Sequence, residues 1–175
     1  MAQWVEQGDA GDLPATAQIP LGDGPLVTIA GTITVNDADM YCIQSVDPAA
    51  FSASTTGGGA TWDTQLFLFN ANGIGVIAND DSGGLQSLLP AFAACQNSTG
   101  PGQYYVAISR YNKDPLPALS TSNGCNTNSA PITGWGSSTG TAGAYTITLT
   151  SVNYCGTVAT ERGKRLDEDD RRRRF

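Results

Sequence analysis

The chain has 175 residues and a formal net charge of −7, with 40% apolar residues, 14% charged residues and no histidine. This length is typical of one ordinary domain with a real core. The lack of histidine excludes histidine-based metal sites and Ser-His or Cys-His nucleophile pairs. No apolar run reaches the length of about 18 residues that a membrane span needs, so none is predicted.

Charge is divided unevenly along the chain. Residues 1–160 hold 11 acidic side chains and only two basic ones, Arg110 and Lys113, a balance of −9. Residues 161–175 hold seven basic and five acidic side chains, a balance of +2. A body with this much negative charge repels a phosphate backbone, which argues against nucleic-acid binding. It attracts cations instead. The tail is predicted to be a solvated end, with a docking arm for an acidic surface, such as a neighbouring copy, as the alternative.

Residues 1–25 are polar and rich in Gly and Pro, and we interpret them as an extended lead-in. The segments after them show strand-like patterns, with apolar residues at alternate positions or on both parities. The predicted strands are 26–35, 39–46, 64–70, 74–79, 103–110 and 144–152. The side chains expected to point inward are Tyr41, Ile43, Tyr104, Val106, Ile108, Tyr145, Ile147 and Leu149.

No segment before residue 160 repeats with helical spacing, so helices should be few and short. Long loops rich in small polar residues are expected at 52–61, 94–102 and 112–142, and the length of the last favours a functional or cross-linked loop. Short strands separated by turns indicate an all-β, antiparallel β-sandwich with long loops. The predicted division is a lead-in over 1–25, a sandwich domain over 26–160 and a charged tail over 161–175.

Four cysteines are spaced too widely for a zinc ribbon or a Cys-x-x-Cys motif. Their even number indicates two disulfides and an oxidising, extracellular compartment. Of three possible pairings we expect Cys42–Cys155, at the ends of predicted strands, and Cys95–Cys125, beside turn-rich loops. Four reduced, buried thiols are the alternative.

Acidic and amide side chains gather at strand ends and in the lead-in, where almost no Lys or Arg balances them. Calcium takes six to eight oxygen ligands, which carboxylates, amides and carbonyls in turns supply. We therefore predict calcium as a cofactor, with Asx turns as the alternative explanation. The candidate ligands are Glu6, Asp9, Asp12, Asp37, Asp39, Asp63, Asn79, Asp80 and Asp81, and Asn36 precedes Asp37 in the same turn.

Enzymatic activity is not predicted. Neighbouring carboxylates such as Asp80 and Asp81 point apart on a strand and do not form a glycosidase pair. Three aromatic residues, Trp62, Tyr111 and Trp135, could form a stacking platform for sugar rings. The alternative is that these rings cover the edge of the core.

Several motifs occur in an order that resembles the bacterial pre-peptidase C-terminal domain family, which includes the collagen-binding domains of secreted collagenases. The resemblance covers about 1–110 and 143–152. Its motifs are Trp4–Ala17 (WVEQGDAGDLPATA), Gly31-Thr-Ile33, Asn36–Tyr41 (NDADMY), Asp63–Phe69 (DTQLFLF), Asn72-Gly73, Asn79-Asp-Asp81 and Gly102–Ser109 (GQYYVAIS).

The resemblance implies a secreted, non-catalytic, jelly-roll-like sandwich in which calcium joins an acidic N-terminal segment to the domain. Glu6, Asp9, Asp37 and Asp39 match such a site by position, with Asp12 as a further ligand. The acidic residues at 63 and 79–81 match other family positions, where a structural role is equally expected. The chain departs from the family in the insertion 112–142, and no peptidase domain precedes it.

Two functions follow as hypotheses for a calcium-stabilised extracellular module. One is a structural or adhesive role, including self-assembly into a surface layer or filament, which the charged tail favours. The other is an accessory binding domain for an extracellular protein or polysaccharide in a secreted hydrolase system.

Overall fold

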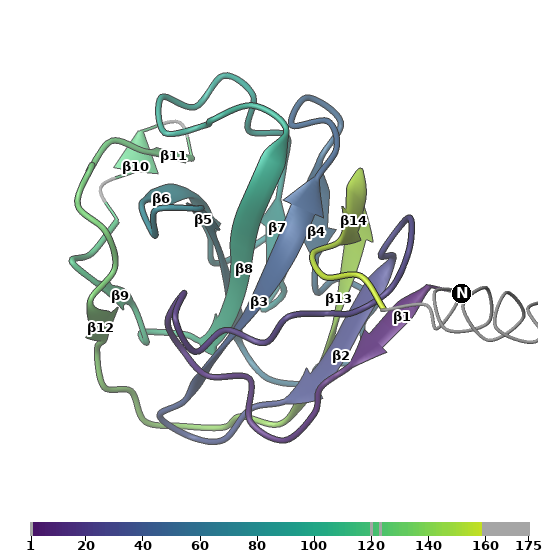
Figure 1. Cartoon of the computed structure of the whole chain (residues 1–175). Coiled ribbons are helices and arrows are strands. Elements are labelled where there is room, and N and C mark those ends of the chain that lie inside the picture. The colour runs from purple at the N-terminus through teal and green to yellow at the C-terminus, as the bar shows by residue number, and fades with distance from the viewer. Residues whose placement is uncertain (1, 120, 123, 159–175) are drawn as a thin grey trace, which may run out of the picture.

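The computed structural model describes residues 2–119, 121–122 and 124–158, and its regular elements are all β-strands (Figure 1). None of the described residues belongs to a helix that could cross a membrane. The predicted charged tail, 161–175, lies outside the described residues. The prediction of an all-β sandwich is confirmed.

Two main sheets and a short ribbon make up the domain. The five-stranded sheet has the order β1 (Gln3–Val5), β2 (Thr28–Thr32), β13 (Ala144–Thr150), β4 (Ser52–Ser54) and β7 (Leu88–Leu89). The seven-stranded sheet has the order β10 (Thr121–Ser122), β11 (Cys125–Asn126), β6 (Gly75–Asn79), β5 (Thr64–Asn70), β8 (Gly102–Arg110), β3 (Ala38–Ser45) and β14 (Val152–Tyr154). The ribbon pairs β12 (Gly134–Trp135) with β9 (Pro115–Leu116).

The lead-in contributes a strand that the sequence analysis did not predict. Strand β1 adds to the edge of the five-stranded sheet by pairing in parallel with β2, whereas the other strand pairs are antiparallel. Further along, the Gln18 amide oxygen accepts hydrogen bonds from Trp4 Nε1 at 2.7 Å and from the Gln7 backbone N–H at 3.0 Å. The backbone of Gln18 also pairs with β3, its N–H with the Met40 carbonyl and its carbonyl with the Cys42 N–H, both at 2.9 Å, so the lead-in packs on the sandwich.

Strand boundaries differ from the predicted ones where the backbone turns sharply. The segment predicted over 26–35 forms a strand only at β2, and Asn36 beyond it has a positive φ of 68°. The segment predicted over 144–152 is divided by Ser151, whose φ is 56°, into β13 and β14. Such left-handed positions interrupt the extended backbone that a strand requires.

The main core fills the space between the two large sheets. Alternate side chains of each strand point to the same face, which is why the inward parity of β3, β8 and β13 supplies this core. The residues predicted to point inward are all buried: Tyr41, Ile43, Tyr104, Val106, Ile108, Tyr145, Ile147 and Leu149.

A second apolar cluster covers the outer face of the seven-stranded sheet. The central strand β5 is buried on both faces, with Leu66 and Leu68 in the main core and Phe67 and Phe69 in the outer cluster. Trp135 packs edge-on against Phe67, with ring centroids 5.3 Å apart. The long segment 112–142, predicted as a loop, thus has a structural task, because its apolar residues shield the outer face from water.

Both predicted disulfides are present. Cys42 on β3 is joined to Cys155, which follows β14, with 5.6 Å between their Cα atoms. Cys95 is joined to Cys125 on β11, with a Cα–Cα distance of 5.3 Å. The second bridge cross-links the long segment 112–142 to the loop that precedes β8.

Candidate metal centre

Three carboxylates from distant parts of the chain meet where the lead-in joins the sandwich. Glu6 follows β1, Asp9 lies in the next turn, and Asp39 is on β3. Each offers one oxygen, and these oxygens lie within 4.8 Å of one another. Asp9 is exposed, Glu6 is half-buried and Asp39 is fully buried, at 0% exposure. The three carboxylates therefore extend from the protein surface, at Asp9, to the interior, at Asp39.

Asp39 shares the inward parity of Tyr41 and so points between the sheets. The Tyr145 hydroxyl, from β13 of the opposite sheet, donates a hydrogen bond of 2.5 Å to Asp39 Oδ2. The same hydroxyl lies 2.6 Å from the hydroxyl of Tyr41. The second carboxylate oxygen, Asp39 Oδ1, is buried and has no hydrogen-bond partner. A buried carboxylate oxygen without a donor is costly unless a cation or a proton satisfies it.

Glu6 fixes the lead-in against β2. Its Oε2 accepts a hydrogen bond from the Thr32 backbone N–H at 2.8 Å, and its Oε1 accepts one from the Ala10 N–H at 3.2 Å. Gly31 leaves the space for this arrangement, because a Cβ at that position would lie 2.7 Å from Glu6 Oε2 and would also meet the Tyr145 hydroxyl.

The electrostatics of the cluster disfavour its charged form in the absence of a cation. Burial, followed by repulsion from Glu6, Asp37 and Asp9, raises the pKa of Asp39 to about 8, against the opposing hydrogen bond from Tyr145. Burial also raises the pKa of Glu6, with a smaller contribution from Asp9 and Asp37. A bound divalent ion would reverse this preference by stabilising the carboxylates.

Two predicted ligands lie outside this three-residue group. Asp37 Oδ1 accepts a hydrogen bond of 2.9 Å from the Ala38 backbone N–H, although its charge acts on Glu6 and Asp39. Asp12 contributes its backbone carbonyl to Trp135 Nε1, at 2.6 Å. Neither carboxylate belongs to the group whose oxygens meet within 4.8 Å.

A second acidic group lies at the ends of the central strands. Oxygens of Asp63, before β5, and of Asp80 and Asp81, after β6, lie within 4.8 Å of one another. The expectation that Asp80 and Asp81 point apart on a strand is wrong, because β6 ends at Asn79 and both residues follow it. One oxygen each of Asp63 and Asp80 is buried without a hydrogen-bond partner, and so is Gln86 Oε1. Burial, then repulsion from Asp81, raises the pKa of Asp80 to about 6. Burial also raises the pKa of Asp63.

Two amide side chains near this group, those of Asn79 and Gln86, differ in which of their atoms are free to bind a metal. Asn79, predicted as a ligand, instead accepts a hydrogen bond from the Leu88 N–H at 2.7 Å and donates one to the Asp81 carbonyl at 3.2 Å. Gln86 donates from Nε2 to the Trp62 carbonyl at 3.0 Å, which leaves its oxygen as a further candidate ligand. Gln86 was not predicted, since an isolated glutamine carries no sequence signal for metal binding.

The two basic side chains of the body bind backbone carbonyls. Arg110 donates to the carbonyls of Tyr111, at 2.8 Å, and of Thr139. Lys113 is buried and donates from Nζ to the Gly136 carbonyl at 2.9 Å. Within the described ranges neither forms an ion pair with a carboxylate, although the charge of Arg110 acts to lower the pKa of Asp63 against the larger effect of burial.

The predicted aromatic platform is wrong. Trp62 is in the main core at 4% exposure and donates from Nε1 to the Ala144 carbonyl, so it offers no face to a sugar. Trp135 belongs instead to the outer cluster, where it packs on Phe67 and Phe69. Of the three, Tyr111 is exposed, at 41%. Both tryptophans thus fit the alternative, in which the rings cover apolar core residues.

Comparison with models of known protein families finds no match, and comparison with curated proteins finds none either. The resemblance to pre-peptidase C-terminal domains stays a prediction. The site is therefore interpreted from its own chemistry: oxygen donors, crowded negative charge and buried atoms without partners, which together suit a hard divalent cation.

Proposed function

We propose that this protein is a non-catalytic, calcium-stabilised extracellular β-sandwich module with a structural or adhesive role. The observation that supports this most is Asp39 Oδ1, a buried carboxylate oxygen without a partner beside Glu6 and Asp9. These three residues would hold the ion. The buried position of Asp39 also argues against proton transfer to a substrate, which could not reach it.

Calcium fits this site better than a softer metal. The donors are carboxylate oxygens without any cysteine thiolate or histidine, which is the ligand set of a hard cation. The ion would join Asp39 of the sandwich to two acids of the lead-in. Its task would be to fasten residues 2–25, whose pairing with β2 is only three residues long, onto the domain.

An extracellular location is supported by the two disulfides, because such bonds persist in oxidising compartments. Self-assembly is supported by the opposite charges of body and tail, −9 and +2. The alternative, an accessory binding domain for an extracellular protein or polysaccharide, is supported only by the family resemblance.

Thermal unfolding in millimolar calcium and in chelator tests the calcium proposal. At a calcium concentration 100 times Kd, binding adds about 2.7 kcal/mol to the free energy of unfolding. For a domain of this size the midpoint should then rise by roughly 5–10 °C. Asp39→Asn should abolish the rise, while Asp23→Asn, which removes an exposed carboxylate that belongs to neither acidic group, should keep it. Equal midpoints of the native chain in both solutions would reject calcium.

Calorimetric titration determines how many ions bind. If both acidic groups take calcium, the native chain binds two ions, and Asp39→Asn and Asp80→Asn each remove one. A stoichiometry of one that Asp80→Asn leaves unchanged would restrict the proposal to the group of Glu6, Asp9 and Asp39.

A further inference from the structure

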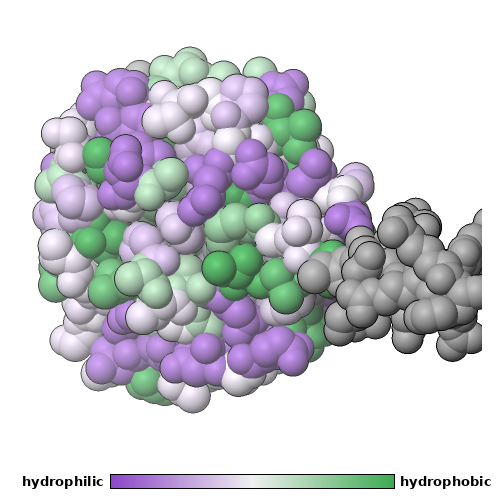
Figure 2. All heavy atoms as spheres, in the orientation of Figure 1, coloured by the Kyte–Doolittle hydropathy of each residue, from purple (hydrophilic) through white to green (hydrophobic). Residues whose placement is uncertain are grey.

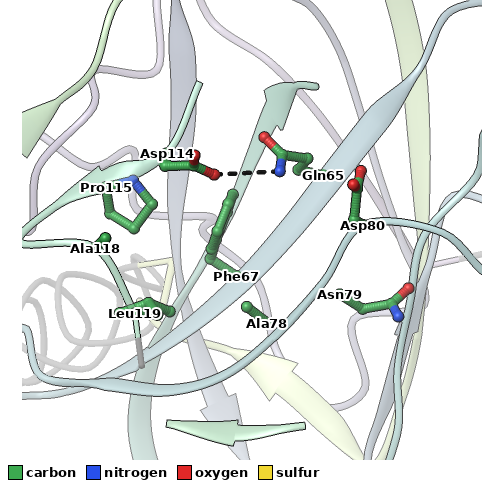
Figure 3. A pocket seen from close by; sticks show the side chains of 9 residues that line it. All are labelled: Gln65, Phe67, Ala78, Asn79, Asp80, Asp114, Pro115, Ala118 and Leu119. Carbon is green, nitrogen blue, oxygen red and sulfur yellow. Dashed lines mark hydrogen bonds between the residues drawn. The ribbon is translucent and has the colours of Figure 1, made fainter. Parts of the chain in front are cut away.

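A pocket of about 270 Å³ opens on the outer face of the seven-stranded sheet (Figure 3). The ring of Phe67 lies in its middle, between the carboxylates of Asp114 on one side and Asp80 on the other. Pro115, Ala118 and Leu119 form an apolar wall. The pocket is separate from the group of Glu6, Asp9 and Asp39.

The lining combines negative charge with apolar surface and includes no basic residue. Asp114 Oδ1 accepts a hydrogen bond of 3.2 Å from Gln65 Nε2, which orients this carboxylate beside the Phe67 ring. Exposed Asp114 suits a guanidinium group, since that group binds carboxylates in a bidentate way, whereas Phe67, at 4% exposure, forms the floor of the pocket and offers little ring face for stacking. The apolar wall suits the aliphatic stem of such a side chain.

The chain carries a matching segment. Arg171–Arg174 are four consecutive arginines, whereas the body has a balance of −9. Arg110 and Lys113 bind carbonyls and do not neutralise the pocket. Figure 2 shows hydrophilic and hydrophobic residues interspersed over one face, without a broad apolar patch for association. The four arginines and the acidic body favour charge complementarity as the attraction between copies.

We propose that the pocket around Phe67 and Asp114 receives an arginine side chain from Arg171–Arg174 of a second copy of this chain. The described chain leaves the sandwich beyond β14, at the edge opposite to β6 and β9, which flank the pocket (Figure 1). A head-to-tail contact of this kind places one pocket and one basic segment on each copy, so it forms closed rings or open chains of molecules. The inference rests on the self-assembly part of the proposed function and does not need the group of Glu6, Asp9 and Asp39; because Asp80 also belongs to the second acidic group, association is measured in chelator.

Sedimentation equilibrium of the full chain in chelator at low salt tests association. The native protein should associate, and about 0.5 M NaCl should dissociate it because salt screens exposed charges. Asp114→Asn should weaken association about tenfold or more, the loss expected for a charged hydrogen bond. Ala118→Trp, which fills the pocket without changing charge, should weaken it too. Asp47→Asn, an exposed carboxylate elsewhere, should not.

Variants of the basic segment separate guanidinium recognition from net charge. Replacing Arg171–Arg174 with Ser should abolish association, and replacing them with Lys should weaken it at unchanged charge, because lysine lacks the planar fork. A synthetic peptide of residues 161–175 should bind to the full-length Ser variant and lose affinity when Asp114→Asn is added.

Three results would overturn the proposal. Association that Asp114→Asn and Ala118→Trp leave unchanged would mean that self-assembly uses another surface. A monomeric native chain that binds no peptide would exclude both the pocket contact and self-assembly. A monomeric native chain whose Ser variant does bind the peptide would place the segment in the pocket of its own chain.

Discussion

Asp39 is fully buried. One of its carboxylate oxygens, Oδ2, accepts a hydrogen bond from the opposite sheet, and the other, Oδ1, has no hydrogen-bond partner. Its parity on β3 is the one that sends Tyr41 and Ile43 into the core, so the backbone places a carboxylate where an apolar side chain would be expected. The Tyr145 hydroxyl satisfies one oxygen. Either a proton or the proposed calcium ion can satisfy the other oxygen. Changes in pH and in calcium concentration should therefore both alter the stability that Asp39 contributes.

Gly31→Ala should disturb the group of Glu6, Asp9 and Asp39 without removing any of its ligands. The added Cβ would collide with the Tyr145 hydroxyl, which donates to Asp39, and would lie 2.7 Å from Glu6 Oε2, so both side chains must shift. We expect a destabilisation of about 1–3 kcal/mol and a smaller calcium-dependent rise in the unfolding midpoint. Gly134→Ala, whose Cβ would meet nothing within 4 Å, is the matched control. A full calcium response in Gly31→Ala would contradict the assigned site.

Stability without calcium should fall as the pH rises. The pKa of Asp39 is raised to about 8 in the folded protein, compared with about 3.9 for an unperturbed aspartate. The folded state thus keeps a proton that the unfolded state releases, and this contribution is full below about pH 4 and lost as the pH passes about 8. Chemical denaturation in chelator from pH 5 to 9 measures the effect. Asp39→Asn should flatten the profile; an equally steep fall in that variant would assign it to other groups, such as Asp80.

At the scale of elements, β5 and the segment 112–142 depend on each other. Phe67 and Phe69 would face water on the outer side of the sheet without the cover that Leu119, Ile132 and Trp135 supply. Cross-linking to Cys95 holds part of that segment in place through Cys125 on β11. The strand and its cover therefore form one packing unit, although long stretches of sequence separate them.

Removing the disulfides should cost more stability for the longer loop, because the loss grows with the logarithm of loop length. The Cys95–Cys125 bridge spans 30 residues and the Cys42–Cys155 bridge spans 113. Loop entropy then gives losses of about 3.5 and about 5 kcal/mol when each pair is replaced by Ala. Denaturant unfolding of the two double variants measures both values. The reverse order would show that packing around Cys125 outweighs loop length.

The regular alternation of β8 and β13 and the two apolar faces of β5 made the central strands predictable. Strand β1 was not, because three residues of a polar lead-in become a strand only through their long-range pairing with β2. For the acidic groups, residue type indicated the chemistry, but loop conformation decided which carboxylates meet. The burial of Trp62 could not be predicted from the sequence either, because its ring is covered only by residues that the tertiary structure brings to it.

At the scale of the whole molecule, the lead-in is the part that the proposed ion would stabilise most. It is held by the three-residue parallel pair of β1 with β2, by the Glu6 carboxylate on the Thr32 N–H, and by isolated backbone hydrogen bonds between Gln18 or Gly11 and β3, whereas β5 and β8 pair over seven residue positions in the middle of their sheet. Segments with few buried contacts open locally at a lower free energy than the core. In chelator the lead-in should therefore open before the sandwich unfolds.

Hydrogen exchange tests this coupling through two amides that donate to Glu6, those of Ala10 and Thr32. In chelator they should exchange much faster than core amides such as those of Leu66 and Val106, because local opening of the lead-in exposes them. Calcium should close this gap, since an ion shared by Glu6, Asp9 and Asp39 makes release of the lead-in as costly as losing the ion. Protection that rises equally in the lead-in and the core would mean that the ion stabilises the sandwich without fastening its N-terminal segment.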